Sequence, residues 1–358
     1  MRARTPDEAD NNFIVREDAL PVMRVDVHNH QLPEPYVDLL LEWDTPVGLK
    51  ADGDTLYMVH RRSGTASVAA GNQIPVNEGF TDIDARIEWM EENDIERTLV
   101  SVSTPNPLDE TFTTDQSTEL VHAINRGYAD LQSRYPDHVA GLGMLPLRDT
   151  EAAVAELDRI ATDLDLAGIA LPTSVGRKKL SASELEPVFD RVDELGLTAF
   201  VHPHGNPLSD ELADHESFLN PLAVFPIETT FQIIRLIYDG FFDRHDFDIV
   251  LSHMGGALLQ LTGRFDRGRS EIDDPVAQPD SPILEYIERF YYDCISFHPP
   301  ALRAAIDTVG SDHLLFGTDF PFDEEDTQTI LADIETVVSD EANQERIMRS
   351  TAVELFDL

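Results

Sequence analysis

The chain has 358 residues, with 26 basic and 68 acidic side chains and a net charge of −42. Nucleic acids are held by counterion release to clusters of Lys and Arg, so a surface this acidic argues against DNA, RNA and anionic membranes as partners. Because 42% of the residues are hydrophobic, the chain can still bury a large core, and we expect a globular protein rather than a disordered one.

The content of cysteine, lysine and arginine indicates where the protein works. Cys294 is the only cysteine, which excludes an intrachain disulfide and a zinc site built on several cysteines. Residues 1–18 are polar and acidic, and no apolar run reaches the roughly 18 residues of a membrane span, so we expect a soluble, cytoplasmic protein. Three lysines stand against 23 arginines, a composition of halophilic type. In concentrated salt, a Debye length of about 3 Å at 1 M screens the self-repulsion.

Eight short apolar runs alternate with longer amphipathic segments, as is typical of βα units around a parallel sheet. The expected strands are Arg24 to His28, Thr98 to Ser103, Val139 to Pro146, Ala167 to Leu171, Thr198 to His202, Asp248 to His253, Tyr291 to Ser296 and His313 to Thr318. The expected helices are Ile83 to Asp94, Gln116 to Tyr135, Glu151 to Leu164, Ser183 to Leu195, Thr229 to Phe242, Gly256 to Arg269, Pro300 to Val309 and Thr327 to Val338. Eight units in one series predict an α/β fold, a (β/α)8 TIM barrel.

This order predicts a single domain over residues 1–358, with the barrel in residues 23–357. The longest interruption, residues 31–81, follows the first strand, and we expect it to form a small hairpin insertion or lid. Residues 340–358 are expected to form a helix beneath the barrel. The segment Thr229 to Phe242 is more apolar than one core face requires, so it either lies between neighbouring helices or forms the interface of a homodimer.

Histidines mark the carboxyl ends of the expected strands, where a barrel of this type builds its active site. Side chains alternate along a strand, so His28 and His30 point the same way, about 6 to 7 Å apart, and can share one metal ion. The fifth strand ends in His202 and His204. One of them could supply a third ligand, and His202, which terminates the strand, is better placed. Each residue alone has an ordinary structural explanation, such as a hydrogen bond to a loop carbonyl.

Two more candidates follow strands six and eight. His253 comes before Gly255 and Gly256, which allow a close approach to the following helix, and Asp319 comes just before Pro321. A closed barrel brings strand eight back beside strand one. The joint occurrence of these residues therefore predicts a metal site of three histidines and one aspartate, with a further histidine nearby.

These motifs resemble the amidohydrolase superfamily, and within it the amidohydrolase-2 branch of aminocarboxymuconate semialdehyde decarboxylase and related aromatic-acid decarboxylases. The matching segments, which follow one another in order along the chain, are Val25-Asp26-Val27-His28-Asn29-His30, Gly168-Ile169-Ala170-Leu171, Phe200-Val201-His202-Pro203, Ser252-His253-Met254-Gly255-Gly256 and Leu315-Phe316-Gly317-Thr318-Asp319-Phe320-Pro321. The resemblance implies one divalent ion, zinc before manganese, bound by His28, His30, His202 and Asp319.

The resemblance also implies roles for residues around the metal. It makes His253 an acid or base near the metal-bound water, and it makes Arg264, eleven residues later, the residue that receives a substrate carboxylate. The alternative for Arg264 is an exposed helix arginine paired with Asp266. Arg61, in the insertion, falls roughly where some decarboxylases keep another carboxylate-binding arginine.

The sequence departs from the family pattern in two places. Binuclear members carry a carboxylated lysine at the end of strand four, whereas this chain has residues 171–174, Leu-Pro-Thr-Ser, so we expect one metal. The decarboxylases often carry a bulky or aromatic residue after the His-Pro of strand five. Here His204 and Gly205 follow, and we expect His204 to contact the substrate.

Two enzyme classes can use these residues on a small-molecule substrate. The resemblance favours non-oxidative decarboxylation of an aromatic or conjugated carboxylic acid, with the proton supplied by His253 or by Asp319. The alternative is hydrolysis of an ester, lactone or amide by metal-activated water. A metal-binding protein without turnover is the third hypothesis, and the complete ligand set argues against it.

Overall fold

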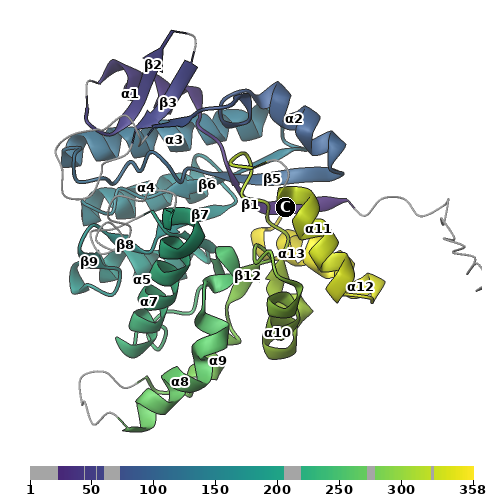
Figure 1. Ribbon diagram of the computed structural model, residues 1–358. Coiled ribbons are helices and arrows are strands. Elements are labelled where there is room, and N and C mark those ends of the chain that lie inside the picture. Colours follow the sequence, from purple (N-terminus) through teal and green to yellow (C-terminus); the bar gives the residue numbers. More distant parts are fainter. Residues whose placement is uncertain are drawn as a thin grey trace, which may run out of the picture.

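The computed structural model describes residues 23–43, 45–53, 55–59, 73–204, 219–271, 279–323 and 326–358. Eight parallel strands form one sheet in the order β1, β5, β6, β7, β10, β11, β12, β13, with helices around it (Figure 1). The strands are β1 (Arg24–His30), β5 (Ile95–Ser101), β6 (Val139–Met144), β7 (Gly168–Pro172), β10 (Ala199–His202), β11 (Ile249–Leu251), β12 (Tyr291–Asp293) and β13 (Leu314–Leu315). The predicted (β/α)8 barrel is confirmed.

The segment after β13 returns to β1 and brings the two ends of the sheet together. Val27 N donates to Phe316 O at 3.0 Å, and His30 N donates to Phe320 O at 2.7 Å. Asp26 supports this seam, because its carboxylate accepts a 2.7 Å hydrogen bond from Thr318 Oγ1. Burial raises the pKa of Asp26 to about 7. The candidate residues at the ends of β1 and β13 are thereby neighbours.

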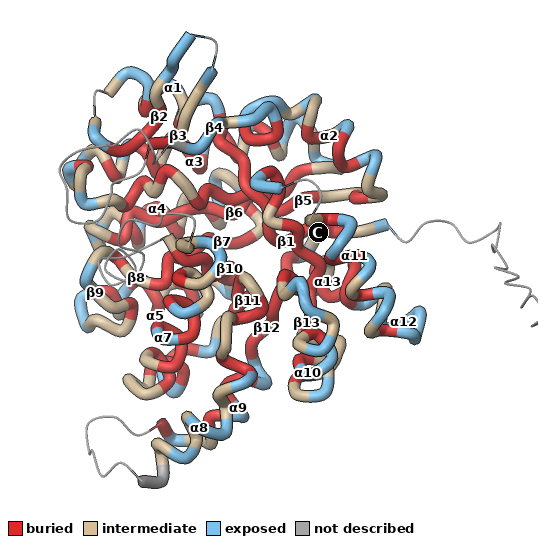
Figure 2. The backbone as a smooth tube through the Cα atoms, viewed as in Figure 1, coloured by how far each residue is buried: buried red, intermediate tan, exposed pale blue. Residues whose placement is uncertain are grey.

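Helices cover the outside of the sheet, and the strands are buried on both faces, as is usual for a parallel sheet (Figure 2). The main helices are α2 (Ile83–Glu92), α3 (Thr114–Arg134), α4 (Thr150–Thr162), α5 (Glu186–Leu195), α7 (Phe225–Tyr238), α8 (Leu258–Glu271), α9 (Ile283–Ile287), α10 (Pro299–Val309) and α11 (Asp326–Val337). Local signals fix their ends. Thr113 caps α3 in a reciprocal capping box with Gln116, and Gly196 ends α5 with a φ of 63°.

The segment between β1 and α2 contains helix α1 (Glu34–Glu42) and a small antiparallel sheet of β2 (Gly48–Asp52), β3 (Thr55–Val59) and β4 (Gln73–Pro75). This small sheet lies at the edge of the barrel, at the top of Figure 1. Arg61 lies outside the described residues.

The chain ends in the short helices α12 (Glu341–Glu345) and α13 (Thr351–Phe356). Thr198, just before β10, donates to Leu355 O at 2.9 Å, so α13 lies at the amino ends of the strands. In the described part of the chain, no helix has both the length and the apolar character needed to cross a bilayer.

Candidate metal centre and active site

His28 and His30 extend from β1 in the same direction, because one residue separates them in an extended strand. Both side chains are buried, and their ring centroids lie 5.2 Å apart. His30 Nδ1 lies 3.3 Å from Ser101 Oγ at the end of β5, and Nε2 of the same ring lies 2.9 Å from Asp319 Oδ1. His28 Nε2 lies 3.4 Å from the same oxygen. Two imidazoles therefore present their Nε2 atoms to one carboxylate.

Asp293 is a site residue that the sequence reasoning missed. It ends β12, is fully buried, and its Oδ2 lies 2.6 Å from His28 Nδ1. The same carboxylate accepts hydrogen bonds from the backbone N–H groups of His253 and Met254, both at 2.8 Å. This partner keeps the Nδ1 proton of His28 in place and leaves Nε2 facing Asp319, as carboxylates behind metal-binding histidines commonly do.

His202 ends β10, as predicted, and its ring faces those of His28 and His30 at centroid distances of 5.1 and 5.0 Å. Its Nδ1 is buried and makes no hydrogen bond with any residue that the structure describes. Burial lowers the pKa of His202 well below its ordinary value, and the neighbouring imidazoles lower it further. A neutral ring with a free lone pair is the form in which histidine binds a metal.

His253 follows β11 in a strained turn, with a φ of 52° at His253 and 56° at Met254. Its ring centroid lies 4.9 Å from that of His28, and its Nε2 lies 3.6 Å from Asp319 Oδ2. Gly255 and Gly256 were predicted to allow a close approach to the following helix, α8, and this prediction was wrong. A Cβ at Gly256 would lie 2.1 Å from Pro226 O, so the close approach is to α7, the helix before β11, rather than to the one after it.

Asp319 sits between these imidazoles. Burial would raise the pKa of its carboxyl, but His28, His253 and His30 together hold that pKa well below its ordinary value. Conversely, burial would lower the pKa of His28, but Asp319 and Asp293 raise it to about 10. A Cβ at Gly317, just before this segment, would lie 2.8 Å from His28 Cβ, so only glycine lets the strand end approach so closely. The arrangement favours a positive charge between His28 and Asp319.

The residues present fit a metal ion. The ligand atoms of His28, His202, His253 and Asp319 all lie within 4.8 Å of one another, and His30 stands beside them on Asp319. Three buried nitrogens have no hydrogen-bond partner in the part of the chain that the structure describes, which is costly in a site that holds nothing. They are His28 Nε2, His202 Nδ1 and His253 Nδ1. Imidazole and carboxylate ligands suit Zn²⁺ and related transition metals.

The sequence analysis also missed Arg86 of α2, which binds the end of β1 that carries His30. Its guanidinium is fully buried and donates to Asn29 Oδ1 at 2.8 Å, to Gln31 Oε1 at 2.6 Å and to the carbonyl oxygen of His30. It also reaches Gly79 O at 3.0 Å. Burial lowers the pKa of Arg86 to about 10, which leaves it charged at neutral pH. One cation thus fixes the backbone that carries His30.

His204 lies beside the histidine cluster, 5.5 Å from His202 between ring centroids. Its Nδ1 lies 2.7 Å from Ser103 O, which can only accept, so Nδ1 carries the proton and Nε2 is an acceptor. Nε2 has no hydrogen-bond partner among the described residues, and burial lowers the pKa of His204 to about 4. His204 therefore offers a neutral hydrogen-bond acceptor rather than a positive charge.

An aromatic wall borders the cluster. The ring of Phe322, which is 41% exposed, lies 5.4 Å from that of His30 and 5.1 Å from that of Phe80.

Arg264, which was predicted to bind a substrate carboxylate, is exposed on α8 and has no hydrogen bond or ion pair with any described residue. Among the described residues, Arg264 therefore has no contact that joins it to the histidine cluster, and the alternative pairing with Asp266 is not formed either.

Comparison with known proteins gives one consistent family. The Amidohydrolase family model, Amidohydro_2, matches residues 25–358. The 2-amino-3-carboxymuconate-6-semialdehyde decarboxylase of Dictyostelium discoideum is 27% identical over 305 residues, covering 84% of this chain and 82% of that protein. The gamma-resorcylate decarboxylase of Rhizobium radiobacter is 28% identical, covering 77% and 87%. The structure of the IDCase of Metarhizium anisopliae in apo form has a TM-score of 0.83 at 25% identity, covering 94% and 97%. The chain belongs to the Amidohydrolase family.

Proposed function

We propose that this protein is a metal-dependent decarboxylase that removes carbon dioxide, without oxidation, from an aromatic or conjugated carboxylic acid. The observation that carries the proposal is the position of His28. Asp293 holds its Nδ1, while its Nε2, which has no hydrogen-bond partner among the described residues, lies 3.4 Å from Asp319 Oδ1. The decarboxylases among its relatives, named above, support the reaction type.

In this proposal, His28, His30, His202 and Asp319 hold one divalent ion, zinc before manganese. When bound, a divalent ion among three neutral imidazoles and one carboxylate would leave the site with net positive charge, which attracts an anionic substrate despite the acidic exterior. Asp293 and Arg86 keep His28 and His30 in position.

The chain's own residues then manage a proton. The bond between the ring or alkene carbon and the carboxylate carbon breaks as carbon dioxide leaves, and the same carbon gains a proton from His253, with Asp319 as the alternative donor. His253 Nε2 lies 3.6 Å from Asp319 Oδ2, so both candidate donors face the same space. Correct placement of a donor contributes about 10² to 10⁴ in rate.

Three further residues belong to the proposal as substrate contacts. His204 accepts a hydrogen bond from the substrate through Nε2, and the exposed face of Phe322 packs against the conjugated system. Arg264 and Arg61 are the candidates for binding a second carboxylate, in the positions that the resemblance assigns to them.

The test is a panel of hydroxylated and aminated aromatic acids, muconate-type acids and lactones, incubated with metal-loaded protein. We expect carbon dioxide from at least one acid, and release about 10² to 10⁴ times slower from the same acid with the His253→Ala variant. Lactone or ester opening without release of carbon dioxide from any acid would replace the proposal with the hydrolase, in which the same ligands activate water.

We also propose the setting in which this activity occurs, a cytoplasm of concentrated salt. The net charge of −42 and the near absence of lysine support it. The proposed assembly is a homodimer. Its support is the outer face of α7, where Ile227 and Phe231 are 51% and 49% exposed while Ile233 and Ile237 on the inner face are buried.

A further inference from the structure

A row of acidic side chains follows one face of α5, away from the histidine cluster. Glu186, Asp190 and Asp193 are spaced i, i+4 and i+7, which places them on the same side of the helix. Like charges at this spacing destabilise a helix unless something positive lies among them. The helix leads into β10, so this face lies toward the amino ends of the strands, at the end of the barrel opposite the candidate active site.

A buried histidine faces this row. His245, in the loop before β11, is only 2% exposed. Its Nδ1 lies 2.7 Å from Asp193 Oδ2. Its Nε2 makes no hydrogen bond within the described ranges and lies 3.5 Å from Glu186 Oε1. In the tautomer whose Nδ1–H donates to Asp193, Nε2 is an acceptor that faces the carboxylate of Glu186. Two acceptors that face one another in this way are joined either by a proton or by a metal ion.

The ligand atoms fit such a cation. One atom each from Glu186, Asp190 and His245 lies within 4.8 Å of the other two. Glu186 is also bound by Arg244, whose Nε lies 2.7 Å from Oε1, but Nη2 is 3.4 Å from Oε2, so the second oxygen is the freer one. Asp190 is exposed and makes no hydrogen bond or ion pair with a described residue.

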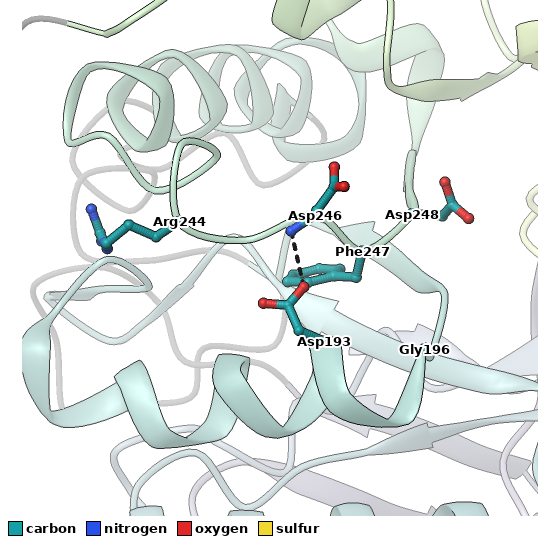
Figure 3. Close-up of a pocket in the computed structure, with 6 residues that line it drawn as sticks. All are labelled: Asp193, Gly196, Arg244, Asp246, Phe247 and Asp248. Carbon is teal, nitrogen blue, oxygen red and sulfur yellow. Dashed lines mark hydrogen bonds between the residues drawn. The ribbon is translucent and has the colours of Figure 1, made fainter.

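A pocket of about 460 Å³ opens beside the cluster and shares Asp193 and Arg244 with it (Figure 3). Its remaining lining residues are Gly196, Asp246, Phe247 and Asp248. The backbone N–H of Asp246 donates to Asp193 Oδ1 at 2.9 Å, which leaves Oδ2 for His245. Around the cluster the carboxylates outnumber Arg244 and Arg289, so the local field attracts positive ions.

We propose that Glu186, Asp190 and His245 form a second metal site, which binds one divalent transition-metal ion such as Zn²⁺ or Mn²⁺. One imidazole and two carboxylates suit these ions better than Ca²⁺ or Mg²⁺, which prefer oxygen ligands alone. Asp193 is the positioning residue, which orients His245 as carboxylates orient metal-binding histidines elsewhere. The site ties α5 to the loop before β11, at the end of the barrel where no chemistry is proposed.

The test is metal stoichiometry, independent of activity. Metal-free full-length protein is dialysed against MnCl2 in 1 M KCl, which screens loose binding to surface carboxylates, and bound manganese is measured by mass spectrometry. We expect two ions per chain for the native protein and one for Asp190→Asn. The matched control is Asp307→Asn, which removes an exposed carboxylate from α10 and should leave two.

A second background separates the two sites. With His28→Ala and Asp319→Ala combined, we expect one ion to remain, and adding Asp190→Asn should remove it. Asp193→Asn should weaken the remaining binding by about 10 to 100-fold. Equal manganese in Asp190→Asn and Asp307→Asn would overturn the second site and leave His245 bridged to Glu186 by a proton. This result would not touch the proposed decarboxylase.

Discussion

His28 Nδ1 and Asp293 Oδ2 lie 2.6 Å apart, although 265 residues separate them in the chain, and both side chains are fully buried. The contact joins the first strand of the barrel to the seventh. Because Asp293 also accepts hydrogen bonds from the backbone at 253 and 254, one carboxylate orients His28 and shapes the turn that carries His253. In the proposed function, metal binding by His28 and proton transfer by His253 would therefore both depend on the buried carboxylate of Asp293.

We expect Asp293→Asn to weaken metal binding at this site by about 10 to 100-fold, since the amide no longer fixes the Nδ1 proton of His28 with a full negative charge. Titration of the metal-free variant with Zn²⁺ against a competing chelator measures the effect. Asp307→Asn, on the surface of α10, is the control for loss of one carboxylate. An affinity equal to that of the control would show that Asp293 acts only on the turn.

The ligand set can be separated from the proton donor. We expect His28→Ala and Asp319→Ala each to lose one metal ion per chain together with turnover, whereas His253→Ala keeps the ion and loses about 10² to 10⁴ in rate. The metal content of the purified variants tests this assignment.

The geometry also allows His253, rather than His30, to be the third histidine ligand, because the ligand atoms of His253 and His28 lie within 4.8 Å of each other. If His253→Ala loses the ion and His30→Ala keeps it, their roles are exchanged.

His204 provides a test of substrate choice. Because Nδ1–H donates to Ser103 O, Nε2 can only accept, and we expect substrates with a hydroxyl or amino group directed at it to bind best. His204→Phe should weaken binding of a hydroxylated acid by about tenfold, equivalent to about 1.4 kcal/mol, and leave its methoxy analogue nearly unchanged. Inhibition constants for the two analogues measure this. Equal losses for both would mean that His204 shapes the pocket without a hydrogen bond.

The sequence predicted the barrel and most of the candidate site because both depend on local patterns. Apolar runs gave the strands, and histidines at the ends of the first, fifth and sixth strands lie together as expected. Asp293 escaped notice because it looks like one acid within an apolar strand, and its meaning comes from a partner at the other end of the chain. The only hint in the sequence was a charged residue inside an apolar strand, where an aspartate needs a buried partner.

Arg86 could not have been found in this way. Nothing in its sequence context distinguishes it from the exposed arginines of other helices, and its burial appears only when residues 29–31 and Gly79 fold around it. The eighth strand was predicted over His313 to Thr318, but regular pairing covers only Leu314–Leu315. The chain beyond leaves the regular ladder to place Asp319, whose φ is 62°, under the imidazoles.

Arg86→Met should lower the free energy of unfolding by about 3 to 5 kcal/mol, because it leaves several buried acceptors without a donor. Chemical denaturation at neutral pH measures the change. Arg303→Met, on the exposed side of α10, is the matched control and should alter stability by less than about 0.5 kcal/mol. Similar values for the two variants would contradict the supporting role of Arg86.

Asp239, at the end of α7, gives a prediction for pH. Partial burial opposes ionisation, but Lys179 and Ser181, whose Nζ and Oγ each lie 2.5 Å from Oδ2, lower the pKa of Asp239 below its ordinary value. A carboxyl whose pKa is lower in the folded state adds stability above its unfolded pKa of about 3.9 and loses it as the pH falls through the folded value. We expect Asp239→Asn to cost about 1 kcal/mol at pH 7, with the difference from the native protein shrinking as the pH falls below about 4. Urea denaturation of both proteins between pH 7 and pH 3.5 measures this difference in the free energy of unfolding. A difference that stays constant over the whole range would show that the charge of Asp239 does not stabilise the contact.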